Sequence, residues 1–224
     1  MRQAERMFCA LGIVSILLST LTGCQQGMSQ PRQKIMLWNG KDFSGWKLYI
    51  PDKDVDVNKV WSVRDGVIYC MGKPNGYMRT KSIYSNYRLH LEWRWPDEPA
   101  NSGVLLNASG EDHVWTKCIE CQLKAGSAGD FVLMNGAGIT VDGKDMQNVE
   151  KQFVVIPKKQ QSSEKAAGQW NVYEIKCGRD SISCYVNGVL QNEGSAPTIT
   201  TGWICLQSEG GPIEFRNIFI EPLN

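Results

Sequence analysis

The segment RLHLEWRW, residues 88–95, alternates strictly between polar and apolar residues. Successive side chains of a strand point to opposite faces of its sheet, so this alternation predicts a strand with one buried face. The apolar side would face a core and consists of Leu89, Leu91, Trp93 and Trp95. The polar side is either a solvated outer face or the floor of a binding site, and it consists of Arg88, His90, Glu92 and Arg94.

Short apolar runs separated by turn residues continue along the chain from Ile35. Asp65-Gly66 stands between two such runs and predicts a hairpin, as does Asn187-Gly188. Further turns are expected at residues 178–180 and 210–212, and only SSEKAAG, residues 162–168, suggests a helical turn. Many short strands around one core predict an all-β fold, an antiparallel sandwich of two sheets.

Alternation also indicates which other polar residues face outward. In KCIECQLK, Glu120 and Gln122 share the face opposite Ile119 and Leu123, and Glu is a poor strand former with no local reason to be there. In WICLQ the outward residues include Trp203 and Gln207, which are plausible sugar contacts by stacking and by hydrogen bonding. The concave outer face of such a sheet would suit a bulky polar ligand.

The N-terminus has the pattern of a bacterial lipoprotein signal. Arg2 and Arg6 precede a short apolar run, and LTGC follows at once. The apolar run is shorter than the roughly 20 residues that a bilayer core requires. We therefore expect a signal peptide over residues 1–23, lipidation of Cys24, a polar linker to residue 34 and one domain over residues 35–224. The protein would then be lipid-anchored in the bacterial cell envelope.

Composition restricts the remaining options. The length of 224 residues suits a single domain with one hydrophobic core. The chain has 24 basic and 23 acidic residues and no basic run, so nucleic acid is not an expected partner. Cys118 and Cys121 form a CxxC pair, but no second such pair or nearby His pair accompanies it, and the two thiols of one strand would face opposite ways. Buried structural cysteines are therefore favoured over a metal or redox site.

Nine motifs, in order and at compatible spacing, make the chain resemble the bacterial 3-keto-disaccharide hydrolase family, also called DUF1080. They span Leu37 to Leu223 and are LWNGKDFSGW, WSVRDGVIY, GYMRT, LEWRW with NSGV, IECQ, QWN, YVNG and GWICLQSEGGPIEFRNI. The resemblance implies a concanavalin A-like jelly roll, exported by bacteria, that cleaves glycosides whose ring carries a ketone at C3. A base would remove the proton on C2, and the enolate would expel the glycosidic oxygen.

The resemblance also implies roles for particular residues. Glu120 would act as base or acid, with Glu92 as its partner and His113 as a second candidate acid or base. Many family members have an acidic residue where this chain has Lys124, and Asp130 is a replacement candidate. The remaining candidate substrate contacts are His90, Arg94, Asn101, Gln122, Lys124, Trp203 and Gln207. Of these, Arg94 would hold the enolate or a hydroxyl.

Two alternatives use the same residues. A conventional glycoside hydrolase would place the Glu92 and Glu120 carboxyls about 5 to 9.5 Å apart, whereas a noncatalytic carbohydrate-binding module would bind sugar without turnover. We expect no cofactor, because no complete metal ligand set is visible. A divalent ion on His90 and Glu92 is the one metal option that the sequence offers. In every case the expected partner is an oligosaccharide or another glycoside.

Overall fold

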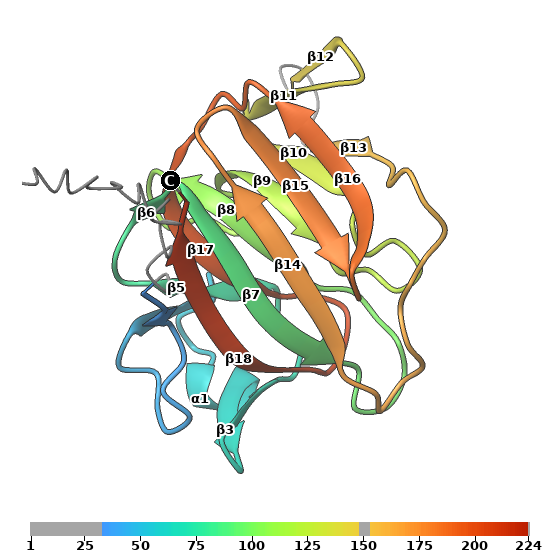
Figure 1. Cartoon of the computed structure of the whole chain (residues 1–224). Helices are drawn as coiled ribbons and strands as arrows, with labels where there is room; N and C mark the ends of the chain where they lie inside the picture. The colour runs from blue at the N-terminus through green and yellow to red at the C-terminus, as the bar shows by residue number, and fades with distance from the viewer. Residues whose placement is uncertain (1–32, 148–152, 224) are drawn as a thin grey trace, which may run out of the picture. The chain divides into compact units, whose positions relative to one another are not determined.

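The computed structural model describes residues 33–147 and 153–223, which form two antiparallel sheets. In Figure 1, β7, β14 and β15 of one sheet lie in front of β8, β9 and β10 of the other. The larger sheet has the strand order β12 (Lys144–Gln147), β11 (Gly138–Val141), β16 (Val189–Ser195), β15 (Ser181–Val186), β14 (Asn171–Cys177), β7 (Tyr87–Arg94), β18 (Ile213–Pro222), β4 (Val67–Cys70) and β3 (Trp61–Arg64), and β1 (Ile35–Met36) also pairs with β18. The smaller sheet has the order β13 (Phe153–Ile156), β10 (Phe131–Met134), β9 (Lys117–Gln122), β8 (Gly103–Ser109), β17 (Thr201–Ser208), β5 (Gly76–Thr80) and β2 (Trp46–Tyr49), and β6 (Tyr84–Ser85) also pairs with β17.

The predicted hairpins are confirmed. β3 and β4 pair across Asp65 and Gly66, whose φ angles of 50° and 79° suit the two-residue turns that match the twist of a hairpin. β15 and β16 pair across Asn187-Gly188 in the same way. No helix forms over residues 162–168, where a helical turn was suggested, and the turn found there is a single one in which Gln169 N donates to Ala166 O at 3.1 Å. The short helix α1 (Val57–Val60) was not predicted; the side chain of Asp56 caps it by accepting from the backbone of Asn58.

The alternation of residues 88–95 correctly predicts the buried face. Leu89, Leu91 and Trp93 are fully buried, and they pack in the core between the sheets with Ile119 and Cys121 of the opposite sheet. Cys118 faces away from this core and packs in a second apolar cluster. The two thiols of the CxxC pair therefore face opposite ways, as predicted, and all six cysteines within the described residues are buried and free.

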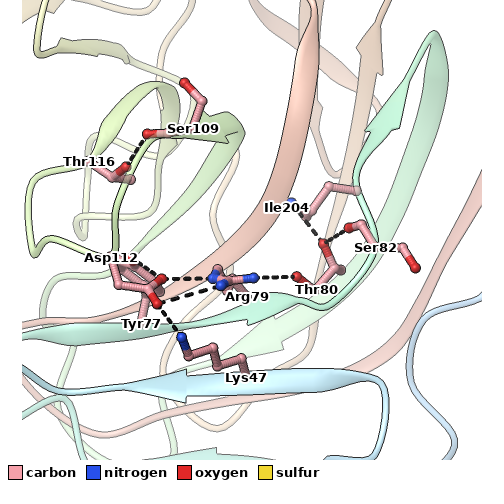
Figure 2. Close-up of polar contacts among 9 residues, drawn as sticks. All are labelled: Lys47, Tyr77, Arg79, Thr80, Ser82, Ser109, Asp112, Thr116 and Ile204. Carbon is pink, nitrogen blue, oxygen red and sulfur yellow. Dashed lines mark hydrogen bonds and ion pairs between the residues drawn. The ribbon is translucent and has the colours of Figure 1, made fainter.

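The second cluster lies on the outer face of the smaller sheet, where the connection between β8 and β9 covers part of it. This connection, residues 110–116, is fixed by Asp112 (Figure 2). The Asp112 carboxylate accepts from Arg79 Nε at 2.7 Å and from the Tyr77 hydroxyl at 3.0 Å, and it also pairs with Lys47. Partial burial favours a higher pKa, but hydrogen bonds from these three residues lower the pKa of Asp112 to about 2.

The predicted signal peptide, Cys24 and the linker up to residue 32 lie outside the described residues. Within the part of the chain that the structure describes, no helix is both long enough and apolar enough to cross a membrane.

Candidate functional site

A cavity of about 430 Å³ opens on the outer face of the smaller sheet, beside the connection that Asp112 anchors. Its volume is in the range of pockets that hold small-molecule ligands. Strands β9, β10, β13 and β17 contribute most of its walls. The lining residues are Asn101, Trp115, Glu120, Gln122, Lys124, Ser127, Asp130, Val132, Met134, Phe153, Val155, Gln207 and Glu209. Six of the predicted site residues are thus brought together: Asn101, Glu120, Gln122, Lys124, Asp130 and Gln207.

Glu120 lines this cavity and is almost fully buried. Its side chain points away from the main core, because Ile119 and Cys121 on either side of it face inward. Gly103 on the neighbouring strand leaves the space that the carboxyl occupies, since a Cβ at that position would lie 1.9 Å from Glu120 Oε1. Burial raises the pKa of Glu120 well above its usual range, and the nearby charge of Glu209 raises it further. Both effects favour the protonated form of Glu120.

Several buried polar atoms in this cavity have no partner within the described residues. They are Oδ1 of Asn101, Oε1 of Glu120 and both amide atoms of Gln207. Buried polar groups without hydrogen bonds are costly and rare, and each needs an explanation. A polar ligand bound in this cavity would supply hydrogen bonds to three such side chains at once.

Glu209 is a site residue that the sequence analysis missed. It follows the last residue of β17, pairs in an isolated bridge with Asn101, and lines the cavity near Glu120. Burial raises its pKa, while a hydrogen bond from Asn101 and the charge of Lys124 act in the opposite direction. The available signal was its spacing of two residues from Gln207, which places both on one face of an extended chain.

The other polar residues of the cavity have defined local roles. Gln122 Oε1 accepts from the backbone of Leu123 and Lys124, both at 2.9 Å, so its amide nitrogen is the group that remains to donate to a ligand. Asp130 Oδ1 accepts from the backbone of Lys158 at 2.8 Å, and this hydrogen bond connects the start of β10 to the segment that follows β13.

Glu92, Arg94 and His90 are not brought into this site. They belong to β7 of the larger sheet and point away from the core on the opposite outer face from Glu120. The expectation that their side of β7 forms the floor of the same cleft is therefore wrong. Strand alternation identified the outward face but not the sheet that each strand joins.

The polar groups of β7 are paired with neighbours on their own sheet. Glu92 accepts from Arg216 Nε at 2.7 Å and from Asn217 Nδ2 at 2.6 Å. Partial burial favours a higher pKa, but these hydrogen bonds and the charge of Arg216 lower the pKa of Glu92. Arg94 Nε donates to Glu214 at 2.6 Å.

His90 also has partners on the larger sheet, and they suit a structural role. It pairs with Glu174, and its ring stacks on Phe219 with the ring centres 4.6 Å apart. No group of three or more His, Cys, Asp or Glu side chains in the described residues is arranged to hold a metal ion.

His113 and Trp203 lie on the same side of the molecule as the cavity but do not line it. His113 Nδ1 accepts from the backbone of Trp115 at 3.3 Å within the β8–β9 connection. Trp203 packs in the outer apolar cluster, where the guanidinium of Arg79 lies 3.8 Å from its ring centre. Both positions support the arrangement of the connection that covers this face.

A family model described as the 3-keto-alpha-glucoside-1,2-lyase-like domain matches residues 33–221. No match is found among curated proteins.

The fold resembles several solved structures. A protein of Parabacteroides distasonis ATCC 8503 with a provisional glycosyl hydrolase assignment is 24% identical, with a TM-score of 0.61 over 85% of this chain and 100% of that chain. A β-glucanase of Bacillus licheniformis is 12% identical, with a TM-score of 0.55 over 88% and 100%. The carbohydrate-binding module CBM66 of Bacillus subtilis is 9% identical, with a TM-score of 0.56 over 80% and 97%. These likenesses confirm the predicted jelly-roll sandwich.

Proposed function

Because the chain belongs to the 3-keto-alpha-glucoside-1,2-lyase-like family, we propose that the cavity over Glu120 cleaves glycosides that carry a ketone at C3 of the sugar ring. The family and the jelly-roll fold support a carbohydrate-active function and a glycoside-acting enzyme. The ketone requirement is the finer part of the proposal. The observation that carries a sugar-binding role for the cavity is the set of unpartnered polar atoms of Asn101, Glu120 and Gln207, while the ketone requirement rests on the family.

The chemistry needs a base, an acid and donors for an enolate. The C3 carbonyl acidifies the hydrogen on C2, so a base removes that proton and the electron pair forms an enolate. The enolate then breaks the bond from C1 to the glycosidic oxygen, and the departing oxygen takes a proton. The products are an unsaturated keto sugar and the free leaving-group alcohol. Addition of water to the double bond would turn the elimination into a net hydrolysis.

The carboxyl pair in the cavity suits the two proton transfers. Two neighbouring carboxyls resist carrying two negative charges at once, so one proton stays on the pair. Burial puts that proton on Glu120, which would give it to the departing oxygen, while Glu209 would take the proton from C2. The amides of Gln122 and Gln207 and the Lys124 ammonium would donate to the enolate and the hydroxyls.

The test is NMR of the purified protein incubated with a 3-keto-disaccharide and, in parallel, with its unoxidised parent. Release of the unsaturated or hydrated keto sugar from the first tube alone is the expected result. An unchanged 3-keto-disaccharide that still binds saturably would contradict the proposal and would favour a noncatalytic binding module, a role held by one of the similar folds.

A conventional glycoside hydrolase is the second candidate, because two carboxyls, Glu120 and Glu209, line one cavity. The pair Glu92 and Glu120 does not serve this alternative, since the two side chains lie on opposite outer faces. Cleavage of the unoxidised parent in the same experiment would favour this second candidate.

We also propose that the chain is exported and anchored in the bacterial envelope through lipid on Cys24, as LTGC at residues 21–24 indicates. The wild-type protein should incorporate radiolabelled palmitate, and the Cys24→Ala variant should not. Equal labelling of the two proteins would exclude Cys24 as the lipid site.

A further inference from the structure

The cavity is divided into a polar end and an apolar wall. The polar end lies over β9, the end of β17 and the loop that joins β9 to β10, and its lining residues are Asn101, Glu120, Gln122, Lys124, Ser127, Asp130, Gln207 and Glu209. The apolar wall belongs to β10, β13 and the β8–β9 connection, and it consists of Trp115, Val132, Met134, Phe153 and Val155. The cavity therefore offers hydrogen bonds at one end and apolar contacts along the other.

Strand register fixes how far the wall lies from the acid. Val132 of β10 pairs with Glu120 of β9, and Val155 of β13 pairs in turn with Val132. Neighbouring strands lie about 4.8 Å apart, so this row places apolar side chains about 5 and 10 Å from the Glu120 position. That interval suits a substrate whose glycosidic oxygen lies near Glu120 and whose leaving group extends over β10 and β13.

The wall also has features that a purely structural surface would not need. Val155 lies on the edge strand β13 with 55% of its surface exposed, and apolar side chains on exposed edges favour unwanted strand pairing. Beside it, Trp115 and Phe153 form an edge-to-face pair with ring centres 5.1 Å apart and an interplanar angle of 87°. Partly exposed aromatic rings at right angles can contact both the face and the edge of a ligand ring.

We propose that this apolar wall is the leaving-group subsite and that the preferred substrate is a glycoside with an apolar ring, aryl or alicyclic, as its aglycone instead of a second sugar. This inference rests on the proposed function, because it assumes that the sugar is cleaved at the Glu120 end. A second sugar would place its hydroxyls against Val132, Phe153 and Val155, which offer no side-chain hydrogen bonds.

The test compares the binding of phenyl, cyclohexyl and methyl 3-keto-glucosides and of a 3-keto-disaccharide. Calorimetry would use the full chain carrying Glu120→Gln, so that turnover does not consume the ligands. We expect the phenyl and cyclohexyl compounds to bind about tenfold more tightly than the other two, as burial of an apolar ring predicts. Adding Phe153→Ala or Val155→Ser should reduce this preference at least about threefold.

The matched control is Val189→Ser, because Val189 is also an exposed valine, at 39%, but lies on β16 of the larger sheet. It should leave the preference unchanged. The inference would be overturned by equal affinities for all four ligands or by tighter binding of the disaccharide. It would also be overturned if the preference for the phenyl and cyclohexyl compounds were unchanged in both wall variants. The proposed function fails separately, if the wild-type protein cleaves none of the four 3-keto-glycosides.

Discussion

The environment of Glu120 opposes a negative charge, and this gives a prediction about both activity and stability. Replacing Glu120 by Gln keeps the side chain neutral and nearly the same size, so the fold should persist while the proton donor is lost. We expect turnover of a 3-keto-glycoside to fall about 10²- to 10⁴-fold. Near-ultraviolet circular dichroism should be unchanged, and an active Glu120→Gln protein would remove Glu120 from the mechanism.

The stability of the same variant has a defined pH dependence. The pKa of Glu120 is raised in the folded protein, so its neutral form contributes stability below the unfolded pKa, about 4.3. That contribution is lost as pH rises toward the folded pKa. Denaturant titrations from pH 4 to pH 8 should therefore show that Glu120→Gln gains stability relative to the wild type as pH rises. A constant difference across this range would mean that folding does not raise the pKa of Glu120.

Gly103 gives a second prediction at the residue scale, because the Glu120 carboxyl occupies the space next to it. An Ala at position 103 would place its Cβ 1.9 Å from Glu120 Oε1, and the flexible end of Glu120 would have to move. We expect Gly103→Ala to reduce kcat more than about tenfold, since small displacements of a catalytic group are costly. The matched control is Gly45→Ala, where the nearest atom would lie at 3.9 Å and activity should be unaffected.

At the scale of elements, the β8–β9 connection depends on one carboxylate. Replacing Asp112 by Asn removes the partly buried charge that Arg79 and Lys47 contact, and we expect a loss of about 2 to 4 kcal/mol in the free energy of unfolding. The control is Asp142→Asn, whose side chain is 70% exposed and should cost less than about 1 kcal/mol. Equal effects of the two substitutions would show that Asp112 does not anchor the connection.

The low pKa of Asp112 also determines how this loss varies with pH. Its carboxylate contributes stability above the unfolded pKa, about 3.9, and the contribution is lost as pH falls through the folded pKa of about 2. The difference between wild type and Asp112→Asn should therefore be full at pH 7 and shrink between about pH 4 and pH 2. Thermal unfolding followed at several pH values measures this, and a difference that persists at pH 2 would contradict the assignment.

The strands also show which structural features could be predicted from sequence patterns and which could not. Alternation predicted the buried and outward faces of β7 and β9 correctly, because that property is local to each strand. It could not predict that β7 pairs with β14 and β18 while β9 pairs with β8 and β10, since strand order depends on contacts between distant segments. Glu209 was missed because it lies beyond the regular part of β17, where the pattern ends.

At the scale of the whole molecule, the two outer faces of the sandwich differ in how their polar groups are satisfied. On the larger sheet, polar groups of β7 pair with β14 and β18, and the guanidiniums of Arg94 and Arg216 both lie over the ring of Trp170. On the smaller sheet, the polar groups of the cavity include buried atoms without partners. Paired groups stabilise a surface, whereas unpartnered ones are available to a ligand.

This difference predicts opposite outcomes for two carboxyl-to-amide substitutions. Glu92→Gln removes the charge that Arg216 and Asn217 contact, so it should lower the free energy of unfolding by about 1 kcal/mol and leave kcat/KM within about twofold of the wild type. Glu120→Gln should reduce turnover about 10²- to 10⁴-fold without that loss of stability. Parallel melts and turnover assays on both variants measure the contrast. Glu92 is not among the residues that line the described cavity, so its substitution should not affect the reacting groups directly. A loss of turnover in Glu92→Gln without a loss of stability would contradict this prediction and would mean that the larger sheet takes part in catalysis.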